Sequence, residues 1–243
     1  MQRSRLSNWR KISVFSSSIG HRMYLTSKPL AALFDMDGLM LDTESIGIEC
    51  WMEAATALSV DMPRALAIGM IGMHYSKTDA YLLEHLGSTA PIDELRAACH
   101  KLYMERTQEP IAHRPGLNDI LSWLEENNIP KAVCTSTRRS IAEHHLRAAG
   151  LWSRFHFAIC GDEVTHPKPA PEIYQKAAAA FNFPTESCVV LEDSDFGVQA
   201  AHQAGCKVIM IPDLRPPSRH SLALNIPILS SLSEARDLLT QAR

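Results

Sequence analysis

Leu30-Ala-Ala-Leu-Phe34 is a short apolar run that leads directly into Asp35-Met-Asp37-Gly38. An uninterrupted apolar run of this length is typical of a strand that is buried on both faces of a parallel sheet. The two carboxylates come where such a strand would end, and open α/β sheets bind their ligands at the carboxyl ends of the strands. This one stretch therefore predicts a parallel α/β sheet, with the functional site at the carboxyl ends of its strands.

Similar apolar runs recur along the chain, with amphipathic helical patterns between most of them. The runs cover 131–134, 156–160, 188–191, 207–211 and 226–229, and the helical patterns cover 117–126, 140–149, 171–181 and 196–204. Strands that alternate with helices form βαβ units, in which helices cover both faces of a parallel sheet. The sequence predicts an α/β fold with a Rossmann-like parallel sheet.

One long stretch interrupts this alternation. Between residues 43 and 110 only helical patterns occur, at 44–58, 63–71, 76–85 and 92–107. We therefore predict a small all-helical domain over 43–110, inserted into an α/β core made of residues 29–42 and 111–243. The hinges are expected near 41–43 and 109–115.

The composition excludes several classes of protein. The 243 residues include 24 basic and 27 acidic ones, which gives a net charge of −3, and 46% are hydrophobic. This is an ordinary globular mixture, and it does not favour binding to nucleic acid or to an anionic membrane. No apolar run is long enough to span a bilayer. The six cysteines are scattered, without metal-binding spacing, which predicts free thiols in a reducing cytoplasm. We also expect a monomer.

The first 28 residues differ from the rest of the chain. They contain six basic residues, many serines and no acidic residue. An organelle transit peptide has this composition, and so does a leader that is disordered or that precedes a true start at Met23. The absence of a clear amphipathic helix favours the leader.

Polar side chains follow the other predicted strands as well. Thr135 and Ser136 end the second strand, Lys168 follows the third, and Glu192-Asp193 end the fourth. Parallel strands bring these residues and Asp35 to one edge of the sheet. Clustered carboxylates repel one another unless a cation lies among them, and an all-oxygen site suits Mg²⁺. A hydroxyl and a lysine beside that cation would hold a phosphate.

Four segments in this order resemble the motifs of the haloacid dehalogenase-like hydrolase superfamily. They are Leu33-Phe-Asp35-Met-Asp37-Gly38-Leu-Met-Leu-Asp42-Thr43-Glu44, Val133-Cys-Thr135-Ser136, His166-Pro-Lys168-Pro169-Ala-Pro171 and Val190-Leu-Glu192-Asp193-Ser194. The helical insertion is similar to the small cap of the branch that contains sugar-phosphate phosphatases and β-phosphoglucomutase. The resemblance implies a Mg²⁺-dependent enzyme that transfers a phosphoryl group through an aspartyl-phosphate.

The resemblance also implies a role for each matching residue. Asp35 would be the nucleophile and Asp37 the general acid and base. Thr135 and the Ser136 amide would bind the phosphoryl group, and Lys168 would neutralise both Asp35 and that group. The metal ligands would be Asp35, the Asp37 carbonyl, Glu192 and Asp193. The remaining residues expected at the phosphate or substrate are Gly38, Glu44 and Arg138, and a loop at 69–77 that includes His74 and Lys77 is a further candidate.

Asp37 favours phosphate-ester chemistry, because dehalogenases of this superfamily lack that second aspartate. β-Phosphoglucomutases that resemble this chain carry a histidine five residues after the aspartate matching Asp42, where this sequence has Gly47. A phosphatase acting on a small phosphorylated metabolite, such as a sugar or polyol phosphate, is therefore favoured over a mutase. A non-catalytic binding protein on this fold remains an alternative, although such a protein would be expected to have lost one of the four charged residues Asp35, Asp37, Lys168 and Asp193.

Overall fold

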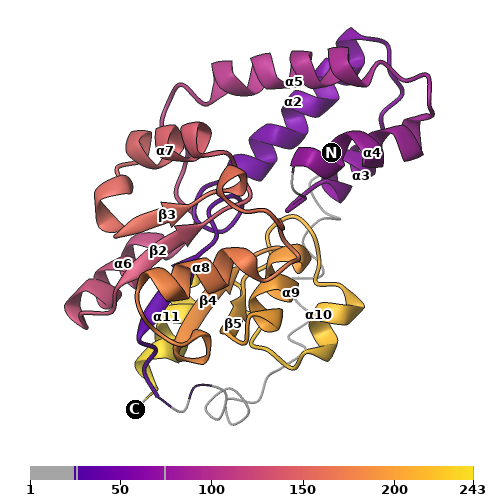
Figure 1. The fold of residues 1–243 in the computed structure, drawn as a ribbon. Coiled ribbons are helices and arrows are strands. Elements are labelled where there is room, and N and C mark those ends of the chain that lie inside the picture. The colour runs from indigo at the N-terminus through magenta and orange to yellow at the C-terminus, as the bar shows by residue number, and fades with distance from the viewer. Residues whose placement is uncertain (1–24, 26, 74, 243) are drawn as a thin grey trace.

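The computed structural model describes residues 25, 27–73 and 75–242. Five parallel strands form one sheet in the order β3-β2-β1-β4-β5. The first strand along the chain therefore lies at the centre of the sheet (Figure 1). The strand bounds are β1 Ala31–Phe34, β2 Lys131–Cys134, β3 Phe157–Ile159, β4 Cys188–Glu192 and β5 Lys207–Met210. The predicted parallel α/β fold is confirmed.

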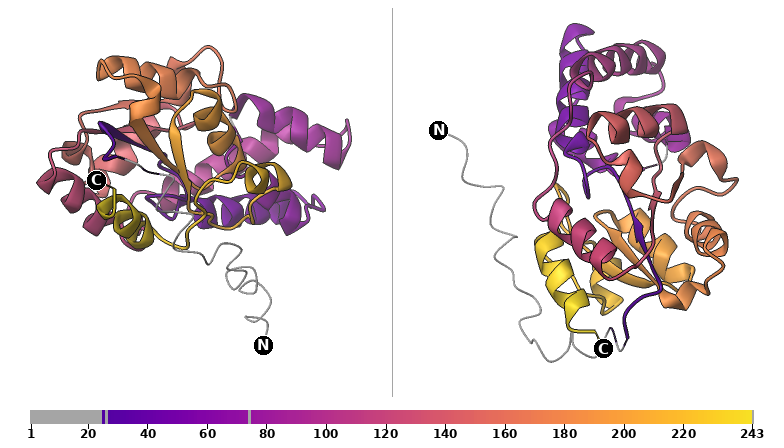
Figure 2. Two further views of the ribbon diagram at one scale, coloured as in Figure 1. Left: turned by 90° about the horizontal axis from the view of Figure 1, so that it is seen from below. Right: turned by 90° about the vertical axis from the view of Figure 1, so that its left-hand side faces the viewer.

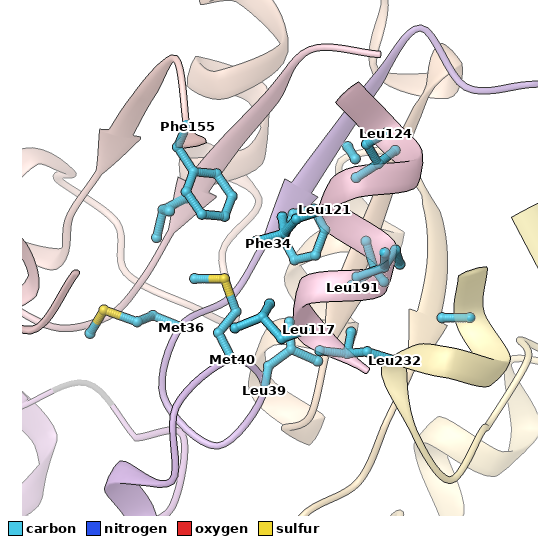
Figure 3. Close-up of a cluster of buried hydrophobic side chains, with 14 of the residues drawn as sticks. Phe34, Met36, Leu39, Met40, Leu117, Leu121, Leu124, Phe155, Leu191 and Leu232 are labelled. Atoms are coloured by element: carbon cyan, nitrogen blue, oxygen red, sulfur yellow. The ribbon is translucent and has the colours of Figure 1, made fainter. Parts of the chain in front are cut away.

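Helices cover both faces of the sheet. Alternate residues of β1 enter two separate hydrophobic clusters, with Phe34 in one and Leu33 in the other, as the two-residue period of a strand requires. Figure 3 shows the first cluster, in which Phe34 lies among side chains of the flanking helices. Its helices are α6 Leu117–Glu126, α7 Arg139–Ala148 and α11 Leu232–Thr240, while α8 Glu172–Ala180 and α9 Asp195–Gln203 cover the opposite face.

The segment between β1 and α6 is mainly helical and has a hydrophobic cluster of its own. It contains α2 Thr43–Ala57, α3 Arg64–Gly69, α4 Tyr75–Leu86 and α5 Ile92–Arg106. Figures 1 and 2 show these four helices gathered at one end of the sheet, with α2 and α5 side by side.

Two antiparallel linkers join the helical segment to the sheet. Leu41 pairs with His113, the Asp42 amide donates to the Ala112 carbonyl (3.1 Å), and the Arg114 amide donates to the Met40 carbonyl (2.8 Å). The paired residues Leu41, Asp42 and 112–114 lie within the ranges predicted for the hinges, and a hinge motion there stays a prediction.

One strand prediction is wrong. The run 226–229 makes only an isolated bridge, between Ile228 and Met210, and does not form a sixth strand. Pro227 accepts a hydrogen bond from the Met210 amide through its carbonyl but has no amide hydrogen to continue the ladder. A short helix, α10 Arg219–Ala223, precedes this run.

The six cysteines are all free and buried, as their spacing predicts. Among the described helices, none is both long and apolar enough to cross a bilayer. The predictions for residues 1–24 and 26 lie outside the described part of the chain.

Candidate active site

Three acidic side chains meet at the carboxyl ends of β1 and β4. Oxygen atoms of Asp35, Glu192 and Asp193 lie within 4.8 Å of one another, and all three residues are buried. Asp35 follows the last residue of β1, and its amide donates to the Leu191 carbonyl of β4 (3.1 Å). The sheet register thus brings together carboxylates that are more than 150 residues apart in the sequence.

Lys168 reaches this group from the segment between β3 and α8. Its Nζ donates to Asp35 Oδ1 (2.6 Å), to Glu192 Oε1 (2.7 Å) and to the Cys134 carbonyl (2.9 Å). The Lys168 side chain is only 2% exposed, so two carboxylates and a carbonyl replace its hydration shell. The predicted pairing of Lys168 with Asp35 is present in the structure.

Glu192 is held on both carboxylate oxygens by protein groups. Its Oε1 also accepts from the Tyr174 hydroxyl (2.9 Å), and its Oε2 accepts from the Ser194 amide (2.9 Å) and the Ser194 hydroxyl (3.0 Å). A Cβ at Gly197 would overlap the Glu192 carboxylate, so α9 can begin this close to β4 only with glycine at that position. Glu192 therefore anchors Lys168 and the start of α9.

Burial and mutual repulsion shift the protonation equilibria of the cluster. Removal from solvent raises the pKa of Asp35 to about 8, with Lys168 opposing the rise and Glu192 and Asp37 adding to it. Burial also raises the pKa of Asp193, which Glu192 and Asp35 raise further. For Lys168, burial lowers the pKa, but the charges of Asp35 and Glu192 outweigh it and hold the pKa above its usual range.

A resident cation fits this arrangement. Three buried carboxylates face one ammonium group, which leaves an excess of negative charge inside the protein. A divalent cation would remove that excess, and the oxygen-only donor set suits Mg²⁺. Asp35 and Asp193 are the better side-chain donors, because four hydrogen bonds already occupy the oxygens of Glu192.

Asp37 lies beside this cluster and is oriented by three threonine hydroxyls. Its Oδ1 accepts from Thr43 (2.8 Å), and its Oδ2 accepts from Thr135 (3.0 Å) and Thr137 (2.7 Å). Thr135 also accepts from the Thr137 amide (3.0 Å). The Thr135 hydroxyl is therefore directed at Asp37 in this structure, and its contact with a phosphoryl group stays a prediction.

Gly38 allows the first motif to turn tightly over the site. Its φ of +79° lies in the left-handed region, and an added Cβ would overlap the Asp193 carboxylate and press on Glu44. The Glu44 carboxylate accepts from the Gly72 amide, and its pKa is raised to about 8, chiefly by burial and then by Asp37 and Asp35. The loop after α3 thus reaches the site through Gly72, although Lys77 is exposed and His74 is not among the described residues.

A cavity of about 870 Å³ opens above these groups, between the sheet and the helical segment. Asp35, Asp37 and Lys168 line its floor, together with Glu44, Ser136 and Arg138, which are also predicted site residues. The next residue, Arg139, does not line the cavity, and its guanidinium pairs with Glu163 (2.6 Å).

The structure brings the predicted residues together and adds partners that the sequence analysis missed. Thr43, Thr137 and Tyr174 each hold a predicted acidic residue in place. Thr137 lies two residues after Thr135, so its nearness to the strand end was a usable signal. Nothing in the sequence marks Tyr174, which reaches Glu192 from the buried face of α8.

Residues 32–211 match the family described as haloacid dehalogenase-like hydrolase. A phosphorylated carbohydrates phosphatase of Thermotoga maritima is 30% identical over 179 residues, which cover 74% of this chain and 83% of that protein. A probable pseudouridine-5′-phosphatase of Drosophila melanogaster is 30% identical over 210 residues, or 83% of this chain and 89% of the relative.

A solved structure is also similar to this chain in its fold. The crystal structure of CbbY from Rhodobacter sphaeroides in complex with phosphate superimposes with a TM-score of 0.70 at 29% sequence identity. The match covers 85% of this chain and 96% of that one.

Proposed function

The chain belongs to the haloacid dehalogenase-like hydrolase family, and from this premise we propose that it is a Mg²⁺-dependent phosphatase that acts through an aspartyl-phosphate. Relatives that are phosphatases support its assignment as a phosphoric monoester hydrolase. The observation that carries the proposal is the placement of two carboxylates in one cavity, Asp35 against Lys168 and Asp37 against three hydroxyls.

In the proposed mechanism the two carboxylates have different tasks. An oxygen of Asp35 attacks phosphorus while Lys168 balances the charge of the nucleophile and of the phosphoryl oxygens. Asp37 donates a proton to the leaving alcohol and then accepts one from the water that hydrolyses the aspartyl-phosphate. We propose that the Ser136 amide and Arg138, which line the cavity, bind phosphoryl or substrate oxygens, and that the Thr135 hydroxyl turns from Asp37 to the phosphoryl group when substrate binds.

We propose that Asp35, Asp193 and the main-chain carbonyl of Asp37 hold Mg²⁺, with Glu192 contributing charge from behind Lys168. The cation would supply electrostatic stabilisation of the phosphoryl group, which is the main catalytic requirement of phosphoryl transfer. The convergence of the Asp35 and Asp193 carboxylate oxygens supports this assignment.

We further propose that residues 43–110 act as a cap over residues 29–42 and 111–243. The paired linkers and the cavity between the two parts support this division. The substrate proposed is a small phosphorylated metabolite of the sugar or polyol phosphate type. A cytoplasmic monomer is also proposed. The six free thiols support a reducing compartment, and gel filtration together with cell fractionation would test the proposal.

A screen of phosphorylated metabolites with Mg²⁺, read out as free phosphate, tests the proposed function. We expect phosphate release that EDTA stops and added Mg²⁺ restores. Release that is indifferent to chelation would overturn the metal site. Conversion of glucose 1-phosphate to glucose 6-phosphate without phosphate release would show a mutase instead.

A further inference from the structure

Gly47 lies inside the helix α2, and neither the backbone nor a packing contact requires glycine there. It does not adopt a positive φ, and a Cβ added to it would meet no atom within 4 Å. Glycine in a helix interior destabilises the helix relative to alanine. Gly47 therefore leaves open space beside the helix, where a larger side chain would fit.

That space belongs to the cavity above Asp37. Gly47 lines this cavity together with Glu44 and Trp51, which precede and follow it by three and four residues. Residues at this spacing share one face of a helix. The cavity face of α2 therefore presents a carboxylate, then bare backbone, then an indole ring.

The walls around this strip are mainly apolar. Ile48 of α2, Met70 and Ile71 after α3, and Tyr103 of α5 line the same cavity. The Tyr103 ring is supported from behind by His145 of α7, with ring centroids 5.7 Å apart. Trp51 and Tyr103 thus offer aromatic surface on two neighbouring helices (Figure 1).

A second set of charged groups on the cavity wall occurs farther along the insertion. Arg96 pairs there with Asp79 and with Asp93, and all three side chains remain about half exposed or more. Arg96 already faces two carboxylates, so this end carries excess negative charge and is poorly suited to a second phosphate. It can still exchange hydrogen bonds with a neutral polar group.

We propose that the substrate is a phosphorylated sugar bearing a planar ring, which lies over Gly47 and stacks on Trp51. This inference rests on the proposed phosphatase function and specifies the leaving group. A bare polyol would leave hydroxyls unpaired against Ile48, Met70 and Trp51, whereas a flat heterocycle buries its faces there. The cavity volume of about 870 Å³ suits such a ligand, because it lies near the upper end of the range for drug-sized molecules.

The test compares two substrates with the same phosphate ester, ribose 5-phosphate and uridine 5′-monophosphate. We expect kcat/KM to be at least about tenfold higher for the nucleotide, because stacking one base on an aromatic side chain strengthens binding by about that factor. Gly47→Leu and Trp51→Ala should each lower this ratio toward one. Gly47→Leu should also keep or raise the melting temperature, because leucine favours helix, and this separates a filled cavity from a misfolded protein.

Glu49→Ala is the matched control, since Glu49 is exposed on the same helix and does not line the cavity. It should leave the ratio unchanged. A wild-type ratio of one or below, or a ratio that Gly47→Leu and Trp51→Ala do not alter, would overturn the inference while leaving the phosphatase proposal in place. If the metabolite screen also releases no phosphate from any ester, the proposed function fails and the inference fails with it.

Discussion

Lys168 provides the positive charge that opposes the three buried carboxylates of the site. Its ammonium contacts Asp35 and Glu192 directly, at 2.6 and 2.7 Å. These contacts keep Lys168 charged despite its burial, and they keep the Asp35 carboxylate fixed at the end of β1. The charge balance at single residues therefore explains why a phosphoryl group and a cation would both be accepted here.

The first prediction concerns the orientation of Asp37. Thr137→Val removes the shorter of the two hydroxyl contacts to Asp37 Oδ2. A hydrogen bond to a charged group contributes about 1.5–3 kcal/mol, so we expect kcat to fall roughly tenfold or more with little change in KM. Steady-state kinetics on the best substrate of the screen measures both constants.

Thr137→Ser retains the hydroxyl and is the control for that change. It should restore most of kcat. An equal loss in the serine and valine variants would argue that Thr137 acts through packing and does not position Asp37.

At this scale the sequence was most informative where one motif carries several functional residues. Asp35, Asp37 and Glu192-Asp193 could be located because each follows an apolar run. Thr43 and Tyr174 could not be assigned, since their roles depend on how α2 and α8 pack against the strand ends. Pairings across long stretches of sequence leave no local pattern.

A few side-chain contacts between helices, strands and linkers hold the site residues in place. Arg114 follows the second linker, bonds to the buried Asp213 after β5 and lies 3.7 Å from Asp42 on the first linker. It therefore connects both linkers to the sheet, next to the start of α2.

The second prediction is that Arg114→Met destabilises the protein by about 3 kcal/mol. Removing one partner of a buried ion pair is strongly destabilising because the remaining charge loses that attraction where water cannot replace it, and the Asp213 side chain is 1% exposed. Urea unfolding gives the free energy of unfolding. Adding Asp213→Asn to Arg114→Met should recover most of the loss, and an additive loss in the double variant would contradict the account.

The third prediction is a pH dependence at the contact between α6 and β2. Hydrogen bonds from Arg154, assisted by Lys131, lower the pKa of Glu125 to about 2 from 4.5. A lowered pKa in the folded state stabilises it above pH 4.5, and this stabilisation is lost as the pH falls toward 2. Because Glu125 is partly exposed, Glu125→Gln should cost only about 1 kcal/mol at pH 7.

Urea midpoints of wild type and Glu125→Gln at pH 7, 4 and 3 check this, with the exposed neighbour Glu126→Gln as the control. The difference between wild type and Glu125→Gln should shrink below pH 4.5. A difference that stays constant across this range would show that the ion pairs contribute nothing to it.

Helices and strands could be predicted where the apolar pattern of the sequence matches the side chains that are buried. The prediction failed where a residue in an apolar run cannot make the backbone hydrogen bonds of a strand. Residues 117–126 were predicted as a helix, and α6 covers Leu117–Glu126. The apolar run 226–229 looks like a buried strand, yet Pro227 lacks the donor that a ladder needs. The short α10 carries too few residues for a periodic pattern to mark it.

The whole molecule combines a mildly acidic chain with a strongly acidic site. The net charge of −3 averages over the entire sequence and does not describe the group formed by Asp35, Glu192 and Asp193. The repulsion within that group lowers the stability of the metal-free protein, so cation binding and folding should be coupled.

The fourth prediction is that Mg²⁺ raises the melting temperature. A ligand at 100 times its Kd stabilises the folded state by about 2.7 kcal/mol, which corresponds to roughly 5–10 °C for a chain of this size. Asp193→Asn should abolish this increase and raise the melting temperature of the metal-free protein, because it removes one of the repelling charges. Thermal scans with NaCl at matched ionic strength separate screening from binding, and an unaltered Mg²⁺ response in Asp193→Asn would place the metal elsewhere.

The fifth prediction tests the central claim that Asp35 is the nucleophile of a phosphatase. Phosphate release by wild type and Asp35→Asn, each with Mg²⁺ and with matched circular dichroism spectra and melting curves, is the most direct measurement. We expect the variant to be folded and to release no phosphate above background, because an amide cannot form the aspartyl-phosphate. A folded Asp35→Asn protein that releases phosphate at the wild-type rate would contradict the account.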